Sequence, residues 1–383
     1  DRMGFFLDAV TQEKFEIQRA TVKNEKGQNY LNRPYGLWNE KTIAALYPYG
    51  HPYSWSTIGY LEDLDRASLS DLKNFFLRWY GPNNASITIG GDINPQEVLA
   101  MVEKYFGPIP AGPKVENMKL ATAQIKSDRY ISHIDNNIRF PAIMMTYPTV
   151  PRMHPDEAAL DCLADILGIG QSSFLFKKFV ETEKAIQASA SHPAAEHAGE
   201  FSLIVLPYPG QTLAEFEVEI RNTLDEFEAV GVNEIDLIKF KAGRESDVIN
   251  GLASVSGKVS QLANYQFMFG KPNLIHQDLQ RYLDVTAEDV MRVFNKYIKE
   301  KSGVIMSYLP SEEVLPAKAD NFFNGLDTIN SFEEIDYGNL TYQKAKDLFD
   351  RSIQPTAGPR PILKVPEYWE ASFENGLKII GTA

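Results

Sequence analysis

The sequence lacks features that mark several large classes of proteins. Cys162 is the single cysteine among 383 residues, so no disulfide can form within the chain. There is no apolar run of about 18 residues, and a membrane-spanning helix is therefore not expected. Positive charge is also scarce: the formal net charge is -13, which argues against a general nucleic-acid binder. The remaining composition, 44% hydrophobic and 23% charged, is that of an ordinary globular protein.

Complete catalytic motifs are also missing from the sequence. Zinc hydrolases of the common classes place two histidines one helical turn apart with a glutamate between them, and none of the six histidines is paired in this way. The nearest approach is His192 with His197, which has one residue too many for H-x-x-E-H; we interpret it as a solvated turn between two strands. The chain has no phosphate-binding P-loop and no G-x-S-x-G elbow. Its own chemistry therefore predicts no complete active site.

The first part of the chain is predicted to be mostly helical. Residues 1–47 carry apolar side chains at helical spacing. Ser68 is placed to cap a further helix with one apolar face. Residues 85–91 alternate as a strand does, and Pro95 then opens another helix.

The second part mixes strands and helices without strict alternation. Its strands come in hairpin-like pairs followed by helices, which favours an α+β fold with antiparallel sheet over a doubly wound parallel sheet. Cys162 falls in an expected helix, where a free cysteine packs as a small apolar residue. The expected strands are 129–134, 141–147, 185–191, 200–206 and 303–309, and the expected helices are 155–168, 172–181, 212–229, 233–250, 254–269 and 286–298.

The length of the chain and its irregular segments suggest three parts. Residues 107–127 are low in periodicity and are interpreted as a linker, so the expected domains are 1–113, 114–310 and 311–383. In the last part we expect a helical turn near Gln343–Phe349, before a proline-rich stretch. This last domain is interpreted as a connector that leads into a hairpin.

Both ends of the sequence interrupt a structural pattern. Met3, Phe6 and Leu7 stand at helical spacing with no capping residue before them, as in the middle of a helix. At the other end, Asn375-Gly376 between short apolar stretches predicts a hairpin whose second strand runs to the last residue. We therefore expect the chain to be an internal piece of a longer protein.

A loose internal repeat is also visible. The stretch from Tyr60 to Tyr80 and the stretch from Tyr282 to Tyr297 each contain a short turn, a capped helix and an aromatic end, and each precedes a strand-like run. By pattern alone a true repeat stays open, because any amphipathic helix before a strand gives a similar match.

Three stretches together carry a resemblance to a known family. They are Arg19–Gln28, Tyr47–Tyr53 and Tyr80–Asp92, the last of which ends a strand-like run in Gly-Gly-Asp before a helix. They resemble the pitrilysin/insulinase family of zinc metallopeptidases, which carry the inverted H-x-x-E-H motif. The resemblance implies repeated α+β domains, each an antiparallel sheet flanked by helices, and two halves that enclose a chamber for unfolded peptides. It favours a true internal repeat.

The resemblance also assigns a metal-ligand position. It places the start of this chain after the H-x-x-E-H helix and matches Glu25 to the third zinc ligand of the parent protein. Two imidazoles and one carboxylate leave an open position on Zn2+ for the water that attacks the peptide bond. Family members often carry a second glutamate seven residues earlier, where this chain has Gln18, which cannot act as a base. No catalytic residue is expected in this chain, and no zinc is expected to bind to it alone.

The resemblance leaves two functions open. The first is a fragment of a zinc metalloendopeptidase that cleaves peptides or unfolded segments, with the other parts of the same protein as its partners. The second is a non-catalytic peptidase-like structural or partner subunit. The aromatic loop from Tyr47 to Trp55 could line a substrate cleft or pack as a closed loop. Bacterial relatives of this kind suggest the periplasm as the location.

Overall fold

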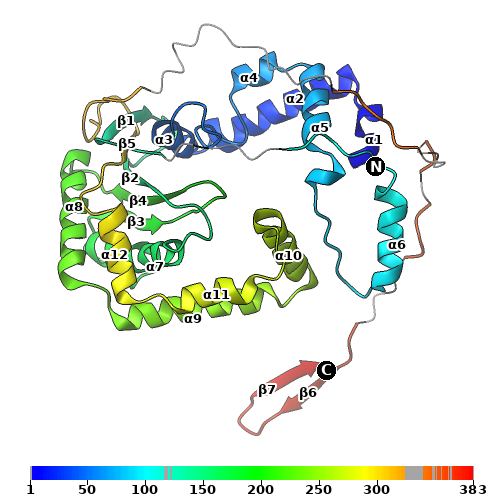
Figure 1. Cartoon of the computed structure of the whole chain (residues 1–383). Helices are drawn as coiled ribbons and strands as arrows, with labels where there is room; N and C mark the ends of the chain where they lie inside the picture. The colour runs from blue at the N-terminus through cyan, green and yellow to red at the C-terminus, as the bar shows by residue number, and fades with distance from the viewer. Residues whose placement is uncertain are drawn as a thin grey trace. The chain divides into compact units, whose positions relative to one another are not determined.

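The computed structural model describes residues 2–115, 120, 123–323, 340–346, 350, 352–354, 356–360, 362 and 365–382. The chain divides into two compact units, Asp1–Ala345 and Lys346–Ala383 (Figure 1). The helical turn expected at 343–349 is absent from 343–346, and 347–349 lie outside the described residues. The division into domains 1–113, 114–310 and 311–383 stays a prediction.

Seven helical segments precede the sheet in the described part of the first unit, besides one short 3-10 turn. Thr11 caps the second helix by accepting the backbone N–H of Lys14. Ser68 and Asp71 form a capping box, which confirms the predicted start of the fifth helix. These segments are α1 (Arg2–Ala9), α2 (Gln12–Lys26), the π-helical turn η1 (Gly27–Leu31), α3 (Trp38–Leu46), α4 (Leu61–Arg66), α5 (Leu69–Trp79) and α6 (Pro95–Phe106).

The strand predicted over residues 85–91 is wrong. This segment is irregular, and the side chains of Ile87 and Ile89 are 54% and 44% exposed. A strand is held by hydrogen bonds to a neighbouring strand, and none of the described strands pairs with this segment. Alternation of side chains alone therefore does not produce a strand here.

A five-stranded sheet forms the centre of the first unit, and it contains all five strands predicted after residue 128. Its order is β1-β5-β2-β4-β3. The pairs β2–β4, β2–β5 and β3–β4 are antiparallel, but β1 and β5 are parallel, so the sheet is mixed rather than purely antiparallel. The strands are β1 (Arg129–Ile134), β2 (Ala142–Thr149), β3 (Ala185–Ser191), β4 (Gly199–Pro207) and β5 (Val304–Leu309).

Helices bury one face of this sheet. Leu160, Cys162 and Leu163 of the central helix are fully buried, which confirms the expected environment of the cysteine. Gly168 ends this helix where a Cβ would lie 1.8 Å from the backbone nitrogen of Ala190, so only glycine allows the close approach to β3. The helical segments are α7 (Glu157–Gly168), the π-helical turn η3 (Phe176–Val180), α8 (Leu213–Val230), α9 (Glu234–Gly251), α10 (Val255–Phe269), α11 (Ile275–Leu283) and α12 (Ala287–Tyr297).

Helix α3 of the first helical block packs on the opposite face of the sheet. Leu46 of α3 and Tyr47 just after it lie in a buried cluster with Val304 of β5. Trp38 packs against a neighbouring cluster that contains Tyr308, whose hydroxyl accepts the backbone N–H of Leu37 at 3.2 Å. The end of α3 is thereby fixed to the sheet, and the loop that follows it begins in the core.

The second unit contains the hairpin that the sequence predicted. Strands β6 (Tyr368–Ser372) and β7 (Lys378–Thr382) pair in antiparallel fashion. Gly376 has a φ of +86°, a conformation that favours glycine, and the Asn375 side chain accepts the backbone N–H of Leu377 at 3.1 Å. Across the described residues, no helix is both long and apolar enough to cross a membrane.

Candidate functional site

Glu25 lies in the last turn of α2 and is exposed. The next residue, Lys26, is only 3% exposed and points the other way. Its ammonium group donates to Glu40 Oε2 at 2.9 Å and to the backbone oxygen of Gly59 at 2.6 Å. Ser56 donates to the same carboxylate oxygen at 3.0 Å. These buried contacts fix the end of α2 and leave the Glu25 carboxylate on its free side.

The surroundings of Glu25 do not complete a zinc site within the described residues. Gln18, Thr21 and Glu25 lie on the same side of α2, and all three are exposed. No group of three histidine, cysteine, aspartate or glutamate side chains in the described part of the chain could hold a metal ion. A carboxylate alone does not meet the three-ligand requirement of a catalytic zinc site. The assignment of Glu25 as a ligand therefore stays a prediction, and no reaction step is derived from it.

The aromatic loop after α3 is packed rather than open at its centre. The ring of His51 stacks on Tyr47 with a centroid separation of 4.8 Å, and Tyr53 meets both rings edge-on. Tyr53 also stacks on His197, whose backbone N–H it accepts at 3.2 Å. The loop thus joins the first block to the turn before β4. Tyr49 and Trp55, at 63% and 41%, remain exposed enough to meet another molecule.

A buried carboxyl group lies close to this loop. Burial raises the pKa of Glu200 to about 7, and its Oε2 has no hydrogen-bond partner among the described residues. Burial also raises the pKa of Tyr47, to which the charge of Glu200 contributes. His51 accepts the backbone N–H of Tyr53 through Nδ1 at 3.0 Å, and burial lowers the pKa of His51. A neutral His51 ring fits this contact, because the accepting nitrogen must be unprotonated.

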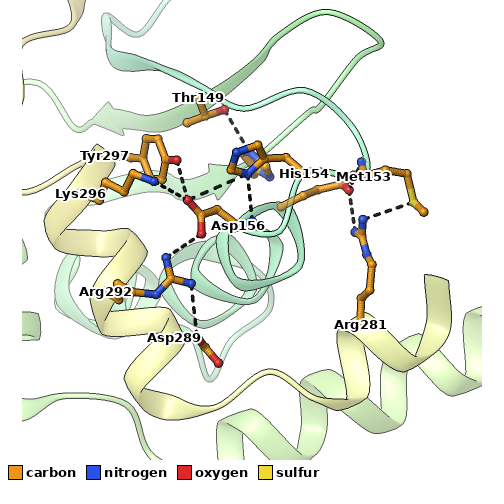
Figure 2. Close-up of polar contacts among 11 residues, drawn as sticks. Thr149, Met153, His154, Asp156, Arg281, Asp289, Arg292, Lys296 and Tyr297 are labelled. Carbon is orange, nitrogen blue, oxygen red and sulfur yellow. Dashed lines mark hydrogen bonds and ion pairs between the residues drawn. The ribbon is translucent and has the colours of Figure 1, made fainter. Parts of the chain in front are cut away.

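Three acidic residues at the N-terminal end of α7, Asp156, Glu157 and Asp161, make ion pairs within the second block. Asp156 accepts hydrogen bonds from Arg292 at 2.6 Å, Lys296 at 2.7 Å and the Tyr297 hydroxyl at 2.6 Å, all from α12 (Figure 2). Burial raises the pKa of Asp156, but the hydrogen bonds from Lys296, Tyr297 and Arg292 outweigh it and hold the pKa well below its usual range. Glu157 pairs with Arg281 of α11 at 2.7 Å.

Asp161, one turn further along α7, forms a relay of hydrogen bonds. Its Oδ1 lies 2.7 Å from His192 Nδ1, and His192 Nε2 lies 3.0 Å from the Thr149 hydroxyl. Arg244 and Tyr282 contact Oδ2 at 3.1 and 2.8 Å. The order acid–imidazole–hydroxyl is that of a catalytic triad. The His192 side chain is 0% exposed, however, so a substrate cannot reach it and the relay is structural.

The interpretation of His192–His197 as a solvated turn is wrong for its first residue. His192 is held inside by Asp161 and Thr149, whereas His197 is exposed as expected. The sequence did not reveal the α7 network, because the cations that pair with it lie far along the chain. Its one local signal is the run of acids at 156, 157 and 161, which would place uncompensated negative charge on a largely buried helix.

Comparison with known proteins shows that the chain is similar to a family of peptidases. The family model "Peptidase M16 inactive domain" matches residues 66–243. The "Zinc protease PqqE" of Helicobacter pylori is 26% identical over 315 residues, which cover 79% of this chain and 68% of that protein. An "Uncharacterized zinc protease" of Mycobacterium leprae is 24% identical over 304 residues, with 79% and 68% covered.

Solved structures show the same fold. A protease from Helicobacter pylori superimposes with a TM-score of 0.69 at 25% identity, covering 79% of this chain and 73% of that one. The M16 inactive domain from Pseudomonas fluorescens gives 0.67 at 19% identity, with 80% and 73% covered. The first half of the periplasmic protease PqqL from Escherichia coli gives 0.60 at 16%, with 80% and 68% covered. These matches confirm the resemblance of this chain to the pitrilysin/insulinase (M16) family of peptidases.

Proposed function

We propose that this chain is part of a zinc metalloendopeptidase that hydrolyses peptide bonds in peptides or unfolded segments. The relatives named as zinc proteases and the shared fold support this proposal. Within it, Glu25 is the third zinc ligand, and an H-x-x-E-H segment elsewhere in the parent protein supplies the two histidines. Bound zinc would polarise the scissile carbonyl and acidify the attacking water. The chain itself contributes the ligand position and its support.

The observation that carries this assignment is the contrast within one helical turn. Lys26 is buried against Glu40, while the adjacent Glu25 is exposed and makes none of the ion pairs found among the described residues. A carboxylate that stabilises the fold would be expected to have a partner. Glu25 instead stands near a fixed helix end with its oxygens available to a metal ion.

The second block is assigned a non-catalytic role in the same protein. Its acidic side chains at 156, 157 and 161 form ion pairs with basic side chains of α9, α11 and α12. The match to an inactive peptidase domain over 66–243 supports this assignment. We propose that this block is a scaffold and a wall for the substrate chamber. We further propose that the parent protein works in the bacterial periplasm, where cell fractionation would detect it.

The test is zinc-dependent peptide hydrolysis by the parent protein and by its Glu25→Gln variant. We expect the parent to cleave an unstructured peptide, and the variant to lose this activity because an amide is a poor zinc ligand. Glu13→Gln, on an exposed turn of the same helix, is the matched control and should keep full activity. Full activity of Glu25→Gln would remove this residue from the ligand role.

The alternative is a non-catalytic partner subunit, and the match to an inactive peptidase domain favours it. In that case the parent protein would hold no zinc and would cleave no peptide even with Glu25 intact. The same assay therefore separates the two functions.

A further inference from the structure

Met153 stands out in the loop between β2 and α7. Its φ is +62°, a left-handed conformation that is uncommon for any residue other than glycine. Such a conformation persists only where surrounding contacts hold it in place. The residue is half-buried rather than enclosed in the core.

The contacts that hold Met153 form a closed ring. Its backbone N–H donates to Glu157 Oε2 at 2.5 Å, and Arg281 Nη2 donates to the same oxygen at 2.7 Å. Arg281 Nη1 then donates to the Met153 sulfur at 3.2 Å (Figure 2). The Glu157 and Arg281 side chains are only 6% and 22% exposed. The sulfur is thus fixed in position against a largely buried guanidinium group.

This guanidinium group is not fully satisfied. Arg281 Nε is buried and has no hydrogen-bond partner among the described residues. One of its remaining acceptors, the thioether sulfur, is weak. An oxygen atom added to the sulfur would place a strong acceptor beside a cation that has hydrogen-bonding capacity to spare.

We propose that Met153 is an oxidation site for peroxides, and that Arg281 holds the resulting methionine sulfoxide in place. A sulfur lone pair attacks one oxygen of hydrogen peroxide, an S–O bond forms and the O–O bond breaks. The sulfur loses two electrons, and the departing hydroxide takes the proton of the transferred oxygen to leave as water.

The effect on stability has an unusual sign. Oxidation of a packed methionine normally disrupts its surroundings, because an apolar side chain becomes polar. At Met153 the new oxygen can accept a hydrogen bond from Arg281 of α11. This bond would hold the loop between β2 and α7 more firmly against α11. Oxidation at this residue is therefore expected to raise the melting temperature.

The test treats the full chain with graded hydrogen peroxide, then maps sulfoxide at each methionine by mass spectrometry of peptides. Met153 should be oxidised at doses that leave the buried Met144, Met145 and Met306 intact, and Met101, at 54% exposed, reports on simple accessibility. Peroxide treatment should raise the Tm of the chain by about 2 °C. The same treatment should not raise the Tm of Met153→Leu. Methionine sulfoxide reductase should abolish the rise.

Met153→Leu conserves volume and removes the oxidisable sulfur, so it is expected to fold. Met101→Leu is the matched control and should keep the peroxide-dependent rise. The proposal is overturned if Met153 stays reduced at doses that oxidise Met101. It is equally overturned if oxidation leaves the Tm no higher than in treated Met153→Leu.

Discussion

The carboxylates of α2 and α7 have opposite environments in the same unit. Glu25 is exposed near the end of α2, and its neighbour Lys26 holds this helix end in place through its contact with Glu40. Asp156 and Asp161 are buried or nearly so, and each is surrounded by cations or hydroxyl donors. The charges of Asp156 and Asp161 are thus compensated within the fold, whereas Glu25 makes none of the ion pairs found among the described residues. Within the proposed function, α2 therefore has the binding role and α7 the supporting role.

The largest expected effect comes from Asp161→Ala. It leaves the buried His192 and the Tyr282 hydroxyl without their acceptor and Arg244 without its counter-charge, which should cost about 3 kcal/mol of unfolding free energy. Denaturant unfolding measures the loss. Glu25→Ala is the control and should change stability by less than about 0.5 kcal/mol. Equal losses of unfolding free energy in the two variants would contradict the different roles of α2 and α7.

A somewhat smaller effect is expected from Lys26→Met. The substitution keeps much of the side-chain volume but leaves the buried Glu40 carboxylate with Ser56 as its remaining partner among the described residues. We expect a loss of about 2 kcal/mol, because an uncompensated buried charge is costly. The measurement is the denaturation midpoint, with Lys14→Met at an exposed position of the same helix as the control. No difference between these variants would show that α2 is anchored by other contacts.

The smallest expected effect concerns Glu200 and depends on pH. Burial raises its pKa to about 7 in the folded chain, from an ordinary value of 4.5, so the folded state retains a proton that the unfolded state has lost. Stability should therefore fall as the pH rises from about 4.5 to about 7. Glu200→Gln removes this dependence and should be more stable than the native chain at pH 8 by about 1 to 2 kcal/mol.

The check is a pair of Tm measurements for Glu200→Gln and the native chain, one at pH 5 and one at pH 8. The advantage of the variant should be larger at pH 8. The exposed Glu196→Gln, in the preceding turn, should show no such difference. A variant advantage that is the same at both pH values would mean that Glu200 is ionised at no cost in the folded chain.

Local signals made most of the fold predictable. The capping box at Ser68, the five strands of the central sheet and the Asn375-Gly376 hairpin all follow from residues close together in the sequence. Two features were not predicted, because distant contacts create them. Strands β1 and β5 pair in parallel across the whole second block, and no helix was predicted where α11 lies.

The site was less predictable than the fold for the same reason. Glu25 came from resemblance to a family, since nothing in its immediate sequence separates it from any exposed helix glutamate. His192 was placed in solvent because its partners, Asp161 and Thr149, lie 31 and 43 residues away. The sequence shows which side chains can ionise, but the fold determines which of them remain available.

The most direct measurement is the zinc content of the purified parent protein, compared between Glu25→Gln and Asp161→Asn after dialysis against a weak chelator. We predict that Glu25→Gln loses its zinc without a change in Tm beyond that of zinc removal. Asp161→Asn should keep one zinc per chain and unfold at a lower temperature. Zinc retained by Glu25→Gln, or lost by a folded Asp161→Asn, would contradict the division of roles between α2 and α7.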